Sequence, residues 1–275
     1  MRPRHLSEPL AVRFILTGTA LAFLVLFLFL PLVVVFTEAL QKGLGVYITA
    51  IRDPVALSAI RLTLLVTVLV VPLNATFGVA AAWAIAKFEF RGKNLLTTLI
   101  DLPFSVSPVI SGMVFVLLLG AHGYLGPWFL ARDVTIIFAL PGIVLATLFV
   151  TFPLVARELI PLMRSQGNDE EAAALTLGAG GWQTFFRISL PKIKWGLLYG
   201  VVLCAARATG EFGAVSVVSG HIRGVTNTIP LHVEILYNEY QFAASFAVAS
   251  LLTLLAVLTL VVKGIIEWRA GSGAV

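Results

Sequence analysis

Charged side chains are scarce in this chain of 275 residues, because Asp, Glu, Lys and Arg together make up only 12% of it. A soluble domain carries about twice that share. Hydrophobic residues make up 59% of the chain, and its mean hydropathy is +0.99. This composition excludes an ordinary soluble domain and predicts a polytopic membrane protein.

Cysteine is nearly absent as well. The single cysteine, Cys204, lies in an apolar stretch, so an intrachain disulfide and a cysteine-based metal site are both excluded. We expect its thiol to be a small buried hydrophobic group. His221 and His232 have no acidic neighbours at the spacing of metal ligands, so we expect no metal site.

The sequence also lacks the signatures of an enzyme. It contains no cluster of a nucleophile with a base, and no G-x-x-x-x-G-K-[ST] loop for nucleotide phosphates, so it cannot hydrolyse ATP alone and we expect no cofactor in this chain. The formal charge of +5 does not indicate nucleic acid, because the basic residues are scattered over short loops.

Long apolar runs are what the sequence has instead. A helix that crosses a bilayer needs about 20 apolar residues. The first run follows Arg2, Arg4 and Arg13, as in a signal peptide, but it is too long for one and lacks a cleavage site, so we expect it to be retained. The six predicted spans of this all-α protein, read as a single transmembrane domain, cover residues 14–37, 62–86, 99–119, 134–155, 195–218 and 242–266.

Lys and Arg are distributed unevenly over the two sides of these spans. With a cytoplasmic N-terminus, thirteen of the 19 basic residues lie on the cytoplasmic side and five on the other, while Arg207 falls inside a span. Cytoplasmic loops collect Lys and Arg, so both termini are predicted to be cytoplasmic. The longest cytoplasmic loop then covers residues 164–194, between spans four and five.

The apolar runs are interrupted by proline and rich in small residues. Such breaks are tolerated where neighbouring helices or an aqueous cavity satisfy the freed backbone groups. The small residues between Gly78 and Ala84 suit close contact of helices. Both features favour a packed transport bundle. The prolines in question are Pro31, Pro72, Pro103, Pro108, Pro141 and Pro153.

The cytoplasmic loop reads as two short helices joined by glycine. Asn168 or Asp169 is a suitable N-cap, and acidic residues occupy the first turn that follows it. Gly178 is expected to end the first helix. The second is expected to run from Gly181 to Ile188 and to stop at Pro191.

The helix pair has an apolar side, which needs a partner if it is exposed. From composition alone, it either folds back on its own bundle or membrane surface, or binds another protein. This side comprises Leu175, Leu177, Trp182, Phe185 and Phe186.

The spacing within the loop is specific. Gly178 is followed by nine residues and then by Ile188-Ser189-Leu190-Pro191. This resembles the EAA loop of the permease subunits of ABC importers, in which Glu-Ala-Ala, three residues, glycine and nine residues precede Ile-x-Leu-Pro. The first half departs from that pattern. Ala172 stands where the family has glutamate, so the contact of that glutamate is not transferred to this chain.

The resemblance implies that the loop carries a coupling helix, which docks on a separate cytoplasmic ATPase subunit and transmits ATP-driven closure to the spans. MgATP would then belong to the ATPase subunits. The residues assigned to the coupling loop in this way are Asp169, Glu170, Glu171, Ala173, Ala174, Gly178, Trp182, Ile188, Leu190 and Pro191.

Other stretches resemble the sulfate branch of these permeases. Residues 206–214 read ARATGEFGA, close to the R-A-x-G-E-F-G-A run of the sulfate/molybdate permeases. Residues 57–63, 101–108 and 216–252 are similar to CysW-type sulfate/thiosulfate permeases. The resemblance implies a heterodimer with a CysT-like permease, two CysA-type cytoplasmic ATPase subunits and an extracytoplasmic sulfate-binding protein, in a bacterial plasma (inner) membrane.

Several polar residues are candidates for the translocation path. Arg207 and Glu211 are four apart, so they can pair on one helix face. Charges within a span usually face a cavity or the bundle interior, so Arg207 either helps an anion to cross or belongs to a neutralised structural pair. Ser105 and Ser107 lie at an expected break in span three, where they either contact sulfate transiently or cap the helix.

The connection between spans five and six is polar, and is expected to lie outside the cytoplasm. It either docks the binding protein or lines the outer gate, or it is an ordinary solvated loop. The residues considered for contact are His221, Arg223, Thr226 and Asn227.

Two alternatives to a sulfate permease stay open. A molybdate or tungstate permease would have the same architecture but would usually be a homodimer. An ion-coupled secondary transporter would more often show inverted repeats or a relay of acids within the spans, and here only Glu211 is a clear intramembrane acid.

Overall fold

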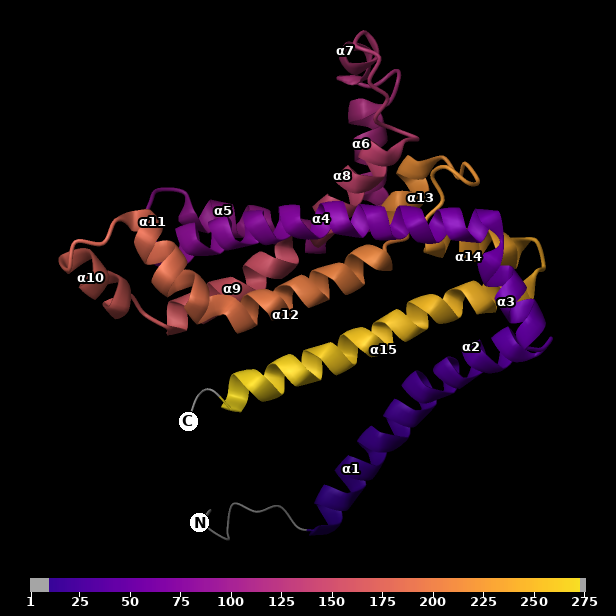
Figure 1. Ribbon diagram of the computed structural model, residues 1–275, viewed down its shortest axis with the longest axis horizontal. Helices are drawn as coiled ribbons and strands as arrows, with labels where there is room; N and C mark the ends of the chain where they lie inside the picture. The colour runs from indigo at the N-terminus through magenta and orange to yellow at the C-terminus, as the bar shows by residue number, and fades with distance from the viewer. Residues whose placement is uncertain (1–9, 273–275) are drawn as a thin grey trace.

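The computed structural model describes residues 10–272, with side chains through Arg269; Arg2 and Arg4, on which the signal-peptide question depended, lie outside the described residues. All regular elements in this range are helical, which confirms the all-α prediction (Figure 1). In chain order the first elements are α1 (Leu10–Leu24), η2 (Val25–Phe29), α2 (Leu30–Leu40), α3 (Leu44–Arg52), α4 (Pro54–Lys87), α5 (Lys93–Ser105), α6 (Pro108–Leu119) and α7 (Gly126–Leu130). The remaining elements are α8 (Leu140–Thr151), α9 (Pro153–Ser165), α10 (Asp169–Thr176), α11 (Gly181–Thr184), η3 (Phe185–Ser189), α12 (Leu190–Thr209), α13 (Gly213–Ser219), α14 (Ile229–Asn238) and α15 (Phe242–Ser272).

Five helices in the described part of the chain are long and apolar enough to cross a membrane, which confirms a multi-pass protein. At 1.5 Å per residue, a 34-residue helix such as α4 is about 51 Å long, which exceeds the apolar thickness of a bilayer. The five spans are Leu10–Leu40, Pro54–Lys87, Leu140–Ser165, Gly181–Thr209 and Phe242–Arg269.

The predicted third span, residues 99–119, is not one straight helix. It consists of α5 and α6, which meet at a bend of 105° around Val106 and Ser107, so the chain has six spans only if this pair counts as one. Pro108 explains the break, because a residue before proline is pushed out of the helical region, and Ser107 has a ψ of 133°.

Spans four and five differ from their predicted limits. The fourth begins at Leu140 rather than residue 134 and continues through Arg157 to Ser165, because α9 is amphipathic and buries its apolar side against α4 and α12. The fifth begins at Gly181 rather than residue 195, because η3 joins the second loop helix to α12, and it ends at Thr209 rather than residue 218. Its last predicted part is the separate helix α13, which follows a break at residues 210–212.

Pro191 does not end the second helix of the cytoplasmic loop, contrary to the prediction. The chain continues from α11 into α12 through the π-helical turn η3, in which the Leu190 N–H donates to the Phe185 carbonyl, five residues back. The same arrangement precedes Pro31, where Leu30 donates to Val25. In each case the wider turn makes room for a proline ring that would clash with an ordinary α-helical turn.

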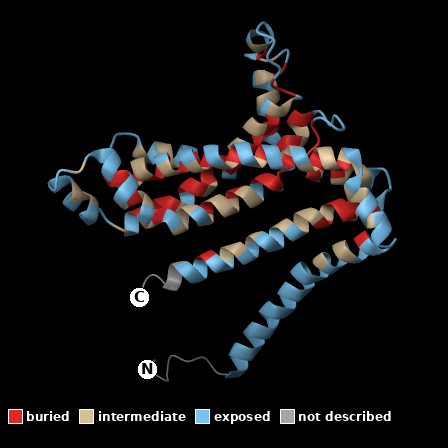
Figure 2. Ribbon diagram, in the orientation of Figure 1, coloured by how far each residue is buried: buried red, intermediate tan, exposed pale blue. Residues whose placement is uncertain are grey.

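The core lies between α4, α8, α9 and α12, and α13 extends it toward α6 (Figure 2). Gly78 allows α4 to pack closely against α9, since a Cβ there would lie 2.6 Å from side-chain atoms of Val155. In contrast, α1 and η2 contain no buried residue. This arm therefore exposes its apolar surface to whatever surrounds the chain, lipid or a second protein.

The first and last helices can be placed relative to the loop helix α10. The start of α1 and the end of α15 both lie toward the side of α10, whereas α3 and the turn between α14 and α15 lie at the opposite end (Figure 1). The termini themselves lie outside the described residues, and their cytoplasmic location stays a prediction.

Candidate functional site

The first loop helix, α10, ends as the sequence predicted. Gly178 has a φ of +88°, a left-handed conformation that favours glycine. Its N–H donates to the Leu175 carbonyl at 3.0 Å, and the Ala179 N–H donates to Ala174 at 3.0 Å. This pair of bonds is a Schellman motif, which satisfies the last carbonyls of the helix. At the other end, Asn168 is the N-cap residue, but its side chain makes no capping hydrogen bond.

Glu171 holds α10 against the bundle. Its Oε1 lies 3.0 Å from Lys87 Nζ at the end of α4 and accepts a hydrogen bond from Ser189 Oγ at 3.2 Å. Lys87 also donates to the Gly167 carbonyl. The Lys87 and Glu171 side chains are only 8% and 13% exposed. Glu171 is thus bound by residues of its own chain. This acid, which lies one position before the glutamate of the family pattern, stabilises the position of α10.

The pKa of Glu171 is lowered. Burial alone would raise it, but the hydrogen bond from Lys87, the backbone N–H, the charge of Lys87 and the bond from Ser189 together outweigh burial. The neighbouring Glu170 pairs with Lys192 of α12 at 2.9 Å and is 62% exposed. The two displaced acids therefore tie α10 to the ends of two different spans.

The apolar side of the helix pair faces outward, except for Phe185. This ring is buried, and its centroid lies 4.8 Å from that of Trp83 in α4. The other four side chains form an exposed surface, in which the Trp182 and Phe186 rings are stacked 6.0 Å apart. We call this surface the loop patch. Its residues and exposed fractions are Leu175 55%, Leu177 88%, Trp182 74% and Phe186 58%.

The remaining predicted loop residues lie around this patch. Asp169 and Ala173 are exposed and Ala174 is half-buried. Ile188 and Leu190 are half-buried in the turn that leads into α12, and Pro191 is exposed. An apolar surface of this kind, rimmed by charges and left uncovered by the described part of the chain, is typical of a protein interaction site.

The predicted pairing of Arg207 with Glu211 is confirmed, although Glu211 lies in the break after the fifth span. Arg207 Nη1 lies 2.6 Å from Glu211 Oε2. Glu211 is 1% exposed, and its other oxygen accepts a hydrogen bond from the Ala214 N–H at 2.8 Å, at the start of α13. Glu211 therefore joins α12 to α13 across the break, while the Arg207 side chain is 41% exposed.

Ser105 and Ser107 are exposed at the bend between α5 and α6. Ser107 is the N-cap residue of α6, but its side chain makes no capping bond. A second ion pair, which the sequence analysis missed, lies near this bend. Arg157 Nε is 3.5 Å from Asp101 Oδ1, and the guanidinium lies 4.8 Å above the Phe104 ring. The signal for it was Arg157, a base placed just beyond the predicted end of span four.

The polar connection after α13 is only partly solvated. His221 and Arg223 are exposed, whereas Thr226 and Asn227 are 1% and 2% exposed. The Ile222 N–H donates to Thr226 Oγ1 at 3.1 Å, which closes the turn on itself. Of the four residues considered for a contact outside the chain, the two exposed ones are accessible in this structure.

Known proteins resemble this chain over nearly its full length. A family model described as "Binding-protein-dependent transport system inner membrane component" matches residues 74–271. The Sulfate transport system permease protein CysW of Synechocystis is 50% identical, over 97% of both chains. That of Synechococcus elongatus is 53% identical, over 93% of this chain and 90% of the relative. CysT of Escherichia coli K12 is 32% identical, over 92% of both.

Solved structures share the fold. A crystal structure of a bacterial alginate ABC transporter, in complex with alginate pentasaccharide-bound periplasmic protein, contains a chain with a TM-score of 0.78 and 17% identity, over 94% of both chains. At this identity the likeness supports the fold alone.

Proposed function

Because this chain belongs to the family of binding-protein-dependent transport system inner membrane components, we propose that it is the permease subunit of an ABC importer that carries sulfate, with thiosulfate as a second substrate. The observation that carries the ABC assignment is the loop patch, an exposed apolar surface on a helix pair that Glu171 and Lys87 hold in place.

The loop patch suits a cytoplasmic ATPase subunit as its partner. The chain has no phosphate-binding loop of its own, so the energy of ATP must arrive through contact. Two such subunits, which bind MgATP, would dock one on each permease. Docking would cover Leu177 and Trp182, which are the most exposed members of the patch.

Movement of α10 can reach the spans by two routes in this proposal. The Lys87–Glu171 pair passes it to α4, and the Lys192–Glu170 pair passes it to α12. Both helices belong to the core around α9, so a displacement of the loop would shift the bundle as a unit and open the path to the other side.

The sulfate assignment and the heterodimer rest on relatives. The named CysW proteins are about half identical to this chain, and CysT is more distant. We therefore propose a CysT-like permease as the second subunit and an extracytoplasmic sulfate-binding protein as the supplier of substrate. In the inner membrane, both termini and the loop patch would face the cytoplasm.

Purification of the complete complex tests the substrate. We expect its ATPase rate to rise with sulfate-loaded and thiosulfate-loaded binding protein, and less with molybdate-loaded protein. A homodimer of this chain that responds best to molybdate would contradict the sulfate assignment. Uptake into vesicles that lack an ATPase subunit would contradict the ABC mechanism.

A pair of matched variants tests the loop patch. Leu177→Asn removes the most exposed apolar side chain of the patch, while Val225→Asn makes a similar change at a site that is 66% exposed in the connection between α13 and α14. We expect only Leu177→Asn to weaken retention of the ATPase subunits on the permease, by about tenfold for a residue at the centre of an interface. Equal retention by both variants would remove the patch as the docking surface.

A further inference from the structure

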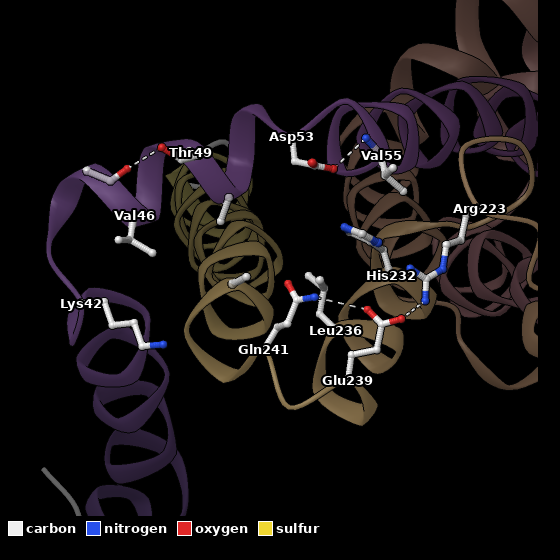
Figure 3. A pocket seen from close by; sticks show the side chains of 13 residues that line it. Lys42, Val46, Thr49, Asp53, Val55, Arg223, His232, Leu236, Glu239 and Gln241 are labelled. Atoms are coloured by element: carbon white, nitrogen blue, oxygen red, sulfur yellow. Dashed lines mark hydrogen bonds and ion pairs between the residues drawn. The ribbon is translucent and has the colours of Figure 1, made fainter.

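A cavity of about 670 Å³ opens at the end of the molecule opposite α10 (Figure 3). Three separate parts of the chain line it: the segment from the turn before α3 to the start of α4, the connection at Arg223, and α14 with the start of α15. Its polar lining is Lys42, Thr49, Asp53, Arg223, His232, Glu239 and Gln241.

The two acids in this cavity are already engaged. Asp53 Oδ1 caps α4, accepting hydrogen bonds from the Val55 and Ala56 N–H groups at 2.8 and 3.2 Å. Glu239 forms an ion pair with Arg223, and accepts a hydrogen bond from Gln241. Glu239 is neutralised by Arg223, whereas Asp53 keeps its charge and forms no ion pair with a cation of the lining among the described residues.

Two other lining groups are unsatisfied. Lys42 is exposed and has no ion pair or hydrogen bond among the described residues. His232 is 5% exposed, and its Nδ1 has no hydrogen-bond partner within the described part of the chain. Both side chains point into the cavity from opposite sides (Figure 3). A cation and an imidazole nitrogen together suit an anionic group that also accepts hydrogen bonds.

We propose that this cavity is a docking point for the substrate-binding protein, and that it receives a carboxylate side chain of that protein between Lys42 and His232. The inference rests on the proposed function, because the family depends on a binding protein. The cavity lies at the end opposite the loop patch, where that protein would approach. Its volume of about 670 Å³ suits a protruding side chain with part of its loop.

The test uses the complete complex in uncharged lipid nanodiscs and measures the Kd of labelled, sulfate-loaded binding protein. Lys42→Gln is expected to raise the Kd about tenfold, as loss of one partner of an interfacial charge pair does, and to reduce the salt dependence of binding. The ATPase rate without binding protein should not change.

Arg52→Gln is the matched control, since Arg52 is exposed at the same end, loses the same charge and does not line the cavity. Its Kd should stay within about twofold of the unchanged protein. A charge swap locates the partner: Lys42→Glu should bind poorly, and one Asp→Lys or Glu→Lys change on the binding protein should restore it.

Three results would overturn the proposal. The first is a Kd for Lys42→Gln equal to that of the unchanged protein. The second is a Kd that depends on Lys42 only when anionic lipid is added, which would make the site one for lipid headgroups. The third is competition by free sulfate for the cavity, which would make it a substrate site. If the unchanged complex does not bind the binding protein at all, the proposed function fails as well.

Discussion

Two acids with little exposed side-chain surface, Glu171 and Glu211, each form an ion pair and help to hold two helices together. In the coupling loop, Glu171 accepts bonds from Lys87 and Ser189, so it fastens α10 to α4 and to the start of α12. In the break after the fifth span, Glu211 forms an ion pair with Arg207 and accepts a hydrogen bond from the backbone of α13. A charge is retained in such surroundings because it is paired.

Removal of the Glu171 charge should release the coupling helix. Glu171→Gln leaves the buried Lys87 ammonium without its carboxylate. We expect this change to destabilise the packing of α10 against the bundle by about 1–3 kcal/mol. Faster hydrogen exchange over residues 168–178 would report it. Glu170→Gln is the control, since that exposed pair should contribute less than about 1 kcal/mol. Equal exchange in both variants would contradict this role of Glu171.

The same carboxylate predicts a pH dependence of the loop. Because the pKa of Glu171 is lower in the folded protein than its ordinary value of 4.5, its stabilising effect is complete above about 4.5 and is lost as the pH falls through the folded pKa. Fluorescence of Trp182 on the loop should therefore change in that acid range. In Glu171→Gln this transition should be missing, and its persistence would show that another group is responsible.

Substitution of Arg207 distinguishes a structural role of this residue from a role in transport. Arg207→Gln leaves Glu211 buried without its cation, which costs about 3–5 kcal/mol, so we expect poorer assembly of the complex and a lower thermal midpoint. Arg207→Gln combined with Glu211→Gln should recover assembly. Size-exclusion chromatography and sulfate uptake decide between the roles. Normal assembly with lost uptake in Arg207→Gln alone would place Arg207 on the translocation path.

At the scale of elements, the contact of α4 with α9 depends on the absence of a side chain at Gly78. A Cβ there would lie 2.6 Å from Val155, in a part of the core with no room for it, so Gly78→Ala should destabilise the protein by about 1–3 kcal/mol. The measurement is the thermal midpoint in detergent. Gly264→Ala in α15 is the control, because nothing lies within 4 Å of its Cβ position. A thermal midpoint that falls equally in Gly264→Ala would show that the loss in Gly78→Ala is not caused by a steric clash.

Helix breaks were harder to predict than helices. Proline marked the bend between α5 and α6 correctly, because the helical region is disfavoured for the residue before Pro108 and Ser107 has left it. The same rule failed at Pro191, where the π-helical turn η3 lets the helix continue. The difference depends on what packs around each site: Phe185, within η3, is anchored by Trp83.

At the scale of the whole molecule, the coupling loop lies at one end, and the cavity lined by Lys42 and His232, here called the outer cavity, lies at the other (Figures 1 and 3). A membrane between them predicts opposite labelling. In a Cys204→Ala background, Val225→Cys should react with an impermeant maleimide on intact cells, and Arg91→Cys only after permeabilisation. Both positions are exposed, so access is set by the membrane. Labelling of Arg91→Cys in intact cells would reverse the proposed orientation.

The sequence by itself determined the membrane class, most of the spans and the glycine elbow of the loop, because each follows from local physics. An apolar run of sufficient length forms a span wherever it lies, and Gly178 adopts a positive φ within its own turn. Only the tertiary structure decided which partners the buried groups have. Lys87 meets Glu171, and Lys42 faces His232 across the outer cavity, because helix packing brings together residues that are far apart in the chain.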